Sequence, residues 1–118
     1  MIKTKEDIEK VKDDFKNASI RTKKAGFDGV EIHAAHEYLL NHFYSPLTNK
    51  RTDEYGGNLE NRLRLANEII QDVRKSVGED YIVAIRFGAY DYWEGGSKLD
   101  EIPIAVKSFI DSGVDLID

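Results

Sequence analysis

The 118-residue chain contains no cysteine, and it has only two prolines, one methionine and one tryptophan. The lack of cysteine excludes disulfides, thiolate chemistry and cysteine-bound metals or iron–sulfur clusters within this chain. No apolar run approaches the roughly 20 residues of a membrane-spanning helix, and the N-terminus does not resemble a signal peptide. Acidic and basic residues are mixed along the chain, so no basic face for nucleic acid stands out. We therefore expect a cytoplasmic protein with neither a membrane nor a nucleic acid as its partner.

The composition is that of an ordinary globular protein, with 41% hydrophobic and 33% charged residues and a net charge of −5. A chain of this length amounts to one domain or less. There is no internal repeat, low-complexity tract or linker. We expect residues 1–118 to belong to one domain, with no second domain in the chain.

Helical and strand patterns alternate along the chain. The helices have apolar positions spaced by three, four and seven residues, and the strands are short, nearly uncharged runs rich in β-branched residues. Thr4 with Asp7 predicts the start of the first helix, and Asn58 predicts that of the second. The expected elements are a helix from 4 to 25, a strand at 29–33, a helix from 58 to 77, a strand at 81–87, a helix at 101–112 and a strand within 113–118. Such alternation predicts an α/β fold with a parallel sheet and right-handed crossovers.

The loops that follow the first two strands, residues 34–57 and 88–100, are long and chemically rich, whereas the loops that follow helices are short. This asymmetry is typical of a (β/α) barrel, in which functional residues gather at the C-terminal ends of the strands. A doubly wound sheet shows it too, but no glycine-rich GxGxxG fingerprint follows either strand. A complete barrel needs eight strands and roughly 200 residues or more. With about three strands, the chain is predicted to be a fragment of a parallel (β/α) barrel.

The stretch EIHAAHEYLL, residues 31–40, has two histidines and a tyrosine at the expected mouth of the first strand. His33 closes that strand, and His36 and Tyr38 follow it. Arg86 closes the next strand, and adjacent strands lie about 4.8 Å apart. Neutral histidines donate hydrogen bonds, tyrosine can hand over a proton, and arginine supplies a permanent positive charge. Together they suit a reaction that builds negative charge on a substrate oxygen and then protonates a carbon.

Other interpretations of the same residues stay open. The pair His33 and His36 could bind a metal, with Glu31 or Glu37 as a third ligand, as in a metal hydrolase. Each histidine could also be a hydrogen-bonded loop residue without a role in chemistry. Arg86 could simply be an ion-pair partner at the end of its strand.

The segments AGFDGVEIHAAHEYLLNHFYSPLTNKRTDEYGGNLENRLRLANEII and VAIRFGAYDYWEGG, with GVDLID after them, closely resemble the Old Yellow Enzyme family of FMN-dependent ene-reductases. The HxxH-x-Tyr motif with SPLTNKRTDEYGG and ENR is highly specific, and its HxxH form is most similar to the bacterial, thermostable-type branch. The resemblance implies a (β/α)₈ barrel that holds FMN at the C-terminal ends of its strands. This chain would then cover about strands 4 to 6 of a TIM barrel.

The resemblance also implies a role for each site residue. His33 and His36 match the pair that binds the activating carbonyl or nitro oxygen of the substrate, and Tyr38 matches the proton donor to the substrate's α-carbon. Arg86 matches the arginine that contacts the N1 and C2-oxygen side of the flavin. The implied reaction is reduction of FMN by NAD(P)H, followed by hydride transfer from the flavin to an activated alkene, an enone or a nitroalkene. A homo-oligomeric state is left open.

One residue departs from the family pattern, because Glu37 stands where the family usually has glycine. If this position needs a positive φ, glutamate would strain it; if not, it adds a negative charge near the substrate. Two further functional alternatives remain open for the chain as a whole. It could be part of a larger family member, such as a dienoyl-CoA reductase or an amine dehydrogenase. It could also be a truncated, non-catalytic barrel fragment that binds FMN weakly and self-associates.

Overall fold

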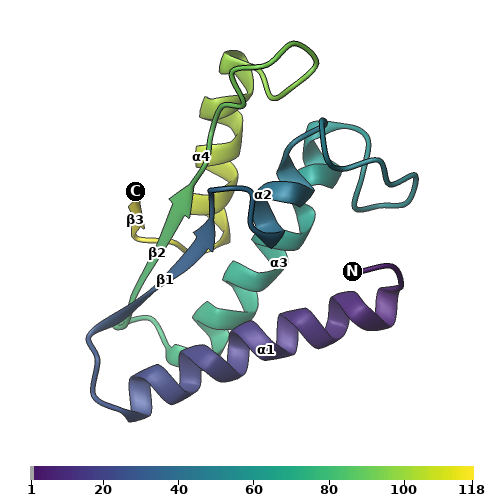
Figure 1. Cartoon of the computed structure of the whole chain (residues 1–118). Coiled ribbons are helices and arrows are strands. Elements are labelled where there is room, and N and C mark those ends of the chain that lie inside the picture. The colour runs from purple at the N-terminus through teal and green to yellow at the C-terminus, as the bar shows by residue number, and fades with distance from the viewer. Residues whose placement is uncertain (1) are drawn as a thin grey trace.

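The computed structural model describes residues 2–118 and shows alternating helices and strands (Figure 1). The elements in chain order are α1 (Lys5–Lys24), β1 (Gly29–Ala34), α2 (Leu39–Tyr44), α3 (Leu59–Val77), β2 (Ile82–Phe87), a 3₁₀ turn (Leu99–Glu101), α4 (Ile102–Ser112) and β3 (Leu116–Ile117). This order confirms the predicted alternation. The short helix α2 is an addition, because the whole of 34–57 was expected to be a loop.

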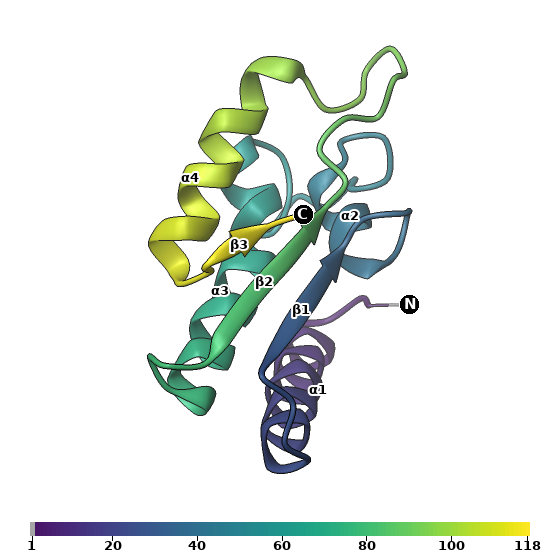
Figure 2. The same ribbon diagram turned by 90° about the vertical axis from the view of Figure 1, so that its left-hand side faces the viewer.

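The three strands form one parallel sheet in the order β1-β2-β3. Figure 2 shows the strands in front and α1, α3 and α4 behind them, so the long helices cover one face only. A doubly wound sheet carries helices on both faces, whereas a barrel carries them only on its outside. The chain is therefore a three-strand segment of a parallel (β/α) barrel, as the sequence predicted.

The helix boundaries follow from local chemistry. Thr4 and Asp7 form the predicted capping box at the start of α1, and the Asn58 side chain accepts a hydrogen bond from the Asn61 N–H at the start of α3. Gly78 and Gly113 end α3 and α4 with φ values of 90° and 127°, a region that glycine enters at little cost.

The hydrophobic core lies between the helices and the face of the sheet that they cover. It is built from side chains that are almost fully buried, including Ile8, Ile32, Ile70, Val83, Ile85 and Phe109. On the opposite face of the sheet, Ile82 and Leu116 remain 52% and 53% exposed. This open face corresponds to the inside of a barrel, where further strands would cover it.

The buried face of α1 includes a polar residue. Ser19 is buried, whereas the neighbouring apolar residue Ala18 is exposed. Ser19 lies eleven residues, or about three full turns, after the buried Ile8, and therefore on the same face of the helix. Its hydroxyl donates to the Phe15 carbonyl at 3.0 Å, which satisfies the buried oxygen.

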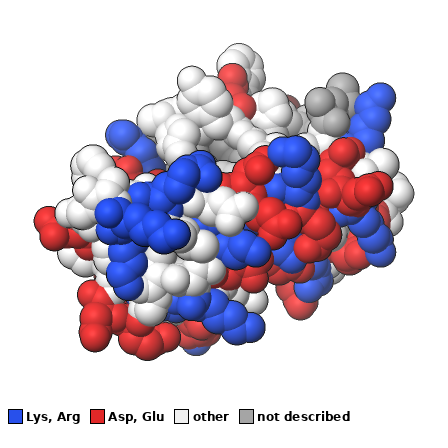
Figure 3. All heavy atoms as spheres, turned by 90° about the horizontal axis from the view of Figure 1, so that it is seen from below, with Lys and Arg blue, Asp and Glu red and all other residues white. Residues whose placement is uncertain are grey.

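Both acidic and basic side chains lie on the exposed surface of α1. Seen from below, acidic and basic side chains are interspersed, with basic ones gathered toward one side (Figure 3). The last turn of α1 holds Arg21, Lys23 and Lys24, where cations favour the negative end of the helix dipole. No helix within residues 2–118 is long and apolar enough to cross a membrane.

Candidate active site

The structure places His33 and Arg86 side by side near the C-terminal ends of β1 and β2, as predicted. They are partners in the parallel register, and such partners project to the same face of a sheet. Ile32 and Ile85, which precede them, point into the core. His33 and Arg86 therefore lie on the open face of the sheet.

A tight turn follows β1 and brings three polar rings together. The Tyr38 N–H donates to the Ala35 carbonyl at 3.2 Å, and the two central residues, His36 and Glu37, have φ values of 57° and 62°. Two consecutive positive φ angles within such a hydrogen-bonded turn are typical of type I′. The centroid of the His33 ring lies 5.2 Å from both the His36 and the Tyr38 ring centroids.

The three rings and Arg86, which we call the polar cluster, have side chains without a hydrogen-bond partner within the described part of the chain. None of the three rings donates or accepts a side-chain hydrogen bond there, and Tyr38 is 64% exposed. Arg86 makes only an ion pair, with its Nε 3.4 Å from Asp118 Oδ2. The hydrogen-bonding capacity of four neighbouring side chains is thus available to a ligand.

The buried arginines of α3 differ sharply from Arg86. Arg62 donates to the carbonyls of Gly57 and Tyr44 and to the carboxylate of Glu101. Arg74 donates to the Asp115 carboxylate and to three carbonyls, those of Gly78, Tyr81 and Gly113. Since all three nitrogens of each of these guanidinium groups are bonded within the fold, they hold loops on α3, whereas Arg86 retains donors that could hold a cofactor.

The loop between α2 and α3 proves to be a rigid scaffold. The Asn49 amide donates to the carbonyls of Phe43 and Tyr55 at 2.6 and 2.8 Å. The Tyr55 hydroxyl donates to the Glu68 carboxylate at 2.9 Å, and burial together with this carboxylate raises the pKa of Tyr55 to about 12. A side chain on Gly56 would collide with the Arg51 carbonyl at 2.3 Å.

The loop after β2 is folded around Asp91. The Asp91 carboxylate accepts hydrogen bonds from the Ser45 hydroxyl and the Ser97 N–H, each at 2.7 Å. A side chain on Gly96 would lie 2.6 Å from Asp91 Cβ, so the loop closes tightly on itself. Through Ser45, at the end of α2, Asp91 joins the two loops that follow the strands.

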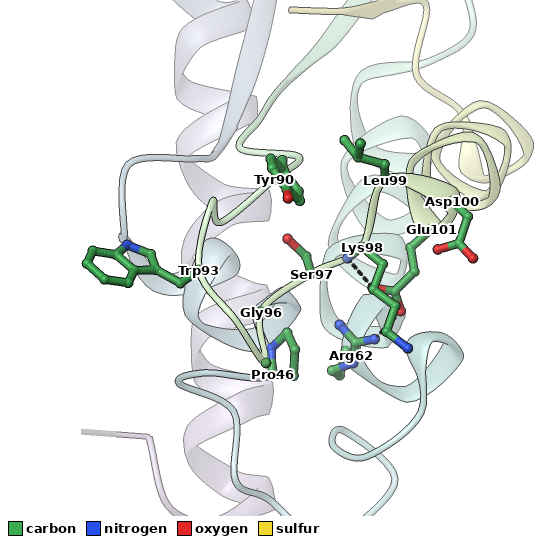
Figure 4. Close-up of a pocket in the computed structure, with 11 residues that line it drawn as sticks. Pro46, Arg62, Tyr90, Trp93, Gly96, Ser97, Lys98, Leu99, Asp100 and Glu101 are labelled. Carbon is green, nitrogen blue, oxygen red and sulfur yellow. Dashed lines mark hydrogen bonds and ion pairs between the residues drawn. The ribbon is translucent and has the colours of Figure 1, made fainter.

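Two cavities border these loops. One of about 700 Å³ is lined by Tyr90, Trp93, Ser97 and Lys98, near the contact between Arg62 and Glu101 (Figure 4). None of the four predicted site residues lines it. A second cavity, of about 390 Å³, has Glu37, Asn41, Asp91 and Trp93 among its lining residues and borders the turn that carries His36 and Tyr38. We place the candidate site at the strand ends because the polar groups available to a ligand lie there.

The metal alternative finds no support in the geometry. Among residues 2–118, no three histidine, cysteine, aspartate or glutamate side chains come together to hold a metal ion. Within these residues, His33 and His36 therefore have no third protein ligand of the kind that a catalytic zinc site uses.

A parallel barrel segment with its polar cluster at the strand ends defines a class of barrel enzyme, and comparison with known proteins identifies the family. The model of the NADH:flavin oxidoreductase / NADH oxidase family matches residues 2–118. The chain is 49% identical over 115 residues to the NADPH dehydrogenase of Halalkalibacterium halodurans. The matched region covers 98% of this chain and 33% of that protein. The chain therefore belongs to this family, whose members use FMN with NAD(P)H as reductant.

Solved structures agree with the barrel fold. A 2-naphthoyl-CoA reductase superposes with a TM-score of 0.91 at 38% identity, over 98% of this chain and 17% of that one. The Old Yellow Enzyme homologue of Zymomonas mobilis superposes with a TM-score of 0.83 at 35% identity, over 95% of this chain and 32% of that one. The chain thus spans a third or less of these relatives.

The sequence reasoning missed Asn41 and Asp91, the two polar residues that organise the loops around the cluster. Both make their key contacts to residues 46 or 47 positions away. The only local signal was their setting, since each polar side chain has aromatic or apolar neighbours in a segment that follows a strand, Asn41 in α2 and Asp91 in the loop after β2.

Proposed function

We propose that this segment forms the substrate-facing part of an FMN- and NAD(P)H-dependent ene-reductase site in the complete barrel, which we call the full-length protein. Residues 1–118 are then part of one (β/α)₈ domain, about strands 4 to 6. The observation that carries the proposal is the cluster of three rings and one arginine, without hydrogen-bond partners in the described chain, at the ends of adjacent parallel strands. The substrate is a small activated alkene, an enone or a nitroalkene.

His33 and His36 act in this proposal as paired donors to the activating oxygen of the substrate. The ring centroids lie 5.2 Å apart, so one N–H from each ring can converge on one carbonyl or nitro oxygen. Two donors at this oxygen stabilise the negative charge that develops there during reduction, as in an oxyanion hole. Bound FMN supplies the hydride for the β-carbon.

Tyr38 is proposed to deliver a proton to the α-carbon. Its ring lies beside His33 and its side chain is 64% exposed, so a substrate held by the histidines can reach the hydroxyl. Arg86 places its charge on the same face, one strand away. There it fits the electron-rich pyrimidine edge of a flavin, which accepts hydrogen bonds from a planar guanidinium.

A second candidate is a reductase that acts on a larger, CoA-linked substrate. The structural match to 2-naphthoyl-CoA reductase, with a TM-score of 0.91, favours it. The roles of the four residues would be the same in both. Reaction of the full-length protein with a simple cyclic enone supports the first candidate, whereas reaction only with an unsaturated CoA thioester supports the second.

The Tyr38→Phe substitution tests the proposal. In the full-length protein it is expected to slow the oxidation of reduced FMN by 2-cyclohexenone by about 10²–10⁴-fold, the usual contribution of a positioned general acid. Reduction of FMN by NADPH should keep its rate, and stopped-flow absorbance of the flavin measures both steps.

Tyr92→Phe is the matched control, because Tyr92 is 83% exposed in the loop after β2 and, among the described aromatic rings, contacts only Tyr90, in an edge-to-face arrangement. It should leave both rates unchanged. An unchanged enone rate in Tyr38→Phe would contradict the proposed proton transfer.

A further inference from the structure

Asn41 connects the turn after β1 to the loop after β2. It lies in the first turn of α2 and is 8% exposed. Its Oδ1 accepts the Glu37 N–H at 2.9 Å, and its Nδ2 donates to the Gly88 carbonyl at 3.2 Å. A single buried amide therefore bonds one backbone group in the turn after β1 and one in the loop after β2.

The two segments that Asn41 joins are in direct contact. The Gly88 N–H donates to the Ala34 carbonyl at 3.0 Å. A Cβ on Gly88 would lie 3.1 Å from the Ala35 Cα and 3.3 Å from the Asn41 Nδ2. Because glycine leaves this space open, the chain after β2 runs close against the turn and can accept the hydrogen bond from Asn41.

The Glu37 N–H, which Asn41 accepts, belongs to the most strained part of the site. Glu37 and His36 both have left-handed backbone conformations, which residues other than glycine, asparagine, aspartate and histidine rarely adopt, so the strain falls mainly on Glu37. Without a partner at the Glu37 N–H, the turn could relax toward negative φ angles. Such a change would move His36 and Tyr38 together, since they flank Glu37 directly.

We propose that Asn41 is a positioning residue, which holds the His36–Glu37 turn left-handed and thereby sets His36 and Tyr38 relative to the strand that carries Arg86. This inference rests on the proposed function for its catalytic consequence, but the conformational role stands on the contacts alone. Asparagine suits the position because one amide both accepts and donates. Aspartate would keep the bond to Glu37 and lose the bond to Gly88, and alanine would lose both.

The conformational role is tested by a stability cycle in the full-length protein. Asn41→Ala is expected to lower the urea midpoint of unfolding by less in the Glu37→Gly background than in the wild type, because glycine holds the left-handed turn without help. Equal losses in the two backgrounds would overturn the inference. If Asn41→Ala does not fold, Asn41→Leu takes its place in the same cycle, because leucine fills the same space and cannot accept the Glu37 N–H.

The catalytic consequence is tested by kinetics. Asn41→Ala is expected to slow enone-dependent oxidation of reduced FMN at least tenfold. In a Tyr38→Phe background the slowing should be several-fold smaller, because the hydroxyl that Asn41 positions is gone and only the effect through His36 remains. Glu37→Gly should restore part of the lost rate. Asn49→Ala removes a buried asparagine whose amide bonds the Phe43 carbonyl of α2 and the Tyr55 carbonyl, and not the turn at Glu37. Its effect should be the same with and without Tyr38→Phe.

The outcomes separate the two proposals. Equal slowing by Asn41→Ala in both tyrosine backgrounds would overturn the positioning of Tyr38. If Tyr38→Phe alone leaves the enone rate unchanged, the proposed function fails, and the stability cycle then decides the role of Asn41 by itself.

Discussion

Glu37 occupies a backbone position at which glycine costs least. It is the second central residue of a type I′ turn, with a φ of 62°, and this turn type favours glycine there. The left-handed conformation costs an ordinary L-residue about 1–2 kcal/mol. The structure thus answers the question that the sequence raised. The position does need a positive φ, and the exposed carboxylate also adds negative charge beside His36 and Tyr38.

The Glu37→Gly substitution is therefore expected to stabilise the full-length protein. The gain should be about 0.5–1 kcal/mol, because the relief of backbone strain exceeds the extra flexibility that glycine gives the unfolded chain. Urea unfolding followed by circular dichroism measures it. The control is Glu37→Gln, which removes the charge but keeps the side chain and the strain. A gain in Glu37→Gln equal to that in Glu37→Gly would mean that charge, and not backbone strain, is the cause.

At the scale of the elements, the residues that carry the resemblance to the family divide into two groups. The histidines and Tyr38 lie free at the strand ends, whereas much of SPLTNKRTDEYGG and ENR serves the fold. Asn49 and Arg62 bond backbone carbonyls, and Tyr55 bonds the partly buried carboxylate of Glu68. This loop runs between α2 and α3, and its polar side chains satisfy backbone groups that no regular helix or strand provides for.

The junction of α3, β2 and β3 depends on Asp115. Its carboxylate accepts the Val83 N–H at 2.9 Å and Arg74 Nη2 at 2.6 Å. The backbone donor at Val83 and the guanidinium of Arg74 lower the pKa of Asp115 below its ordinary value of 3.8. A lowered pKa in the folded state means that the carboxylate stabilises the fold at pH values above its ordinary pKa. The contribution is lost as the pH falls through the folded-state pKa.

Asp115→Asn is accordingly expected to destabilise the full-length protein in a pH-dependent way. The loss should be about 1 kcal/mol at pH 7, the low end for bonds to charged groups, because the side chain is half exposed. The difference from wild type should shrink as the pH falls below about 4, because the carboxylate is then protonated first in the unfolded chain and, at still lower pH, in the folded protein as well. Urea midpoints measured between pH 3 and 7 check this.

Asp111→Asn provides the comparison for Asp115→Asn, because Asp111 makes only an exposed i,i+4 pair with Lys107. It should change the midpoint little at any pH. If the Asp115→Asn loss were the same at pH 3 and pH 7, the carboxylate would not be its source.

At the scale of the whole molecule, no helix within residues 2–118 covers one face of the sheet. Ile82 and Leu116 are about half exposed on it, and β1 and β3 form the open edges of the sheet. Exposed apolar faces and unpaired strand edges promote association. In a complete barrel, further strands cover both edges and fill the interior.

The isolated 118-residue chain is therefore expected to self-associate and to bind FMN weakly or not at all. Light scattering coupled to size-exclusion chromatography gives its mass, and quenching of FMN fluorescence gives its affinity for the cofactor. Ile82→Lys should reduce the association, because it places a charge on the open face. Gln71→Lys adds the same charge to an exposed polar position of α3 and should not. Tight, stoichiometric binding of FMN by a monomer would contradict the prediction.

Much of this architecture could be predicted because it depends on local signals. Helix periodicity, the caps at Thr4 and Asn58 and the β-branched strands are each contained in a few consecutive residues, and the order of the elements implied a parallel sheet. His33 and Arg86 were placed correctly because each closes a strand. The helix α2 was missed, since six residues are too few to show a period. It forms because tertiary contacts bury Leu40, Phe43 and Tyr44.

The sequence by itself therefore determined the kinds of elements, their order, the barrel class and the residues at the strand mouths. Only the tertiary structure decided the register that pairs His33 with Arg86, the left-handed turn at Glu37 and the amide of Asn41 that ties this turn to Gly88. The physical reason is the range of the interactions. Periodicity and capping act within one or two turns of chain, whereas strand register and buried side-chain hydrogen bonds join residues about fifty positions apart, whose proximity exists only in the folded molecule.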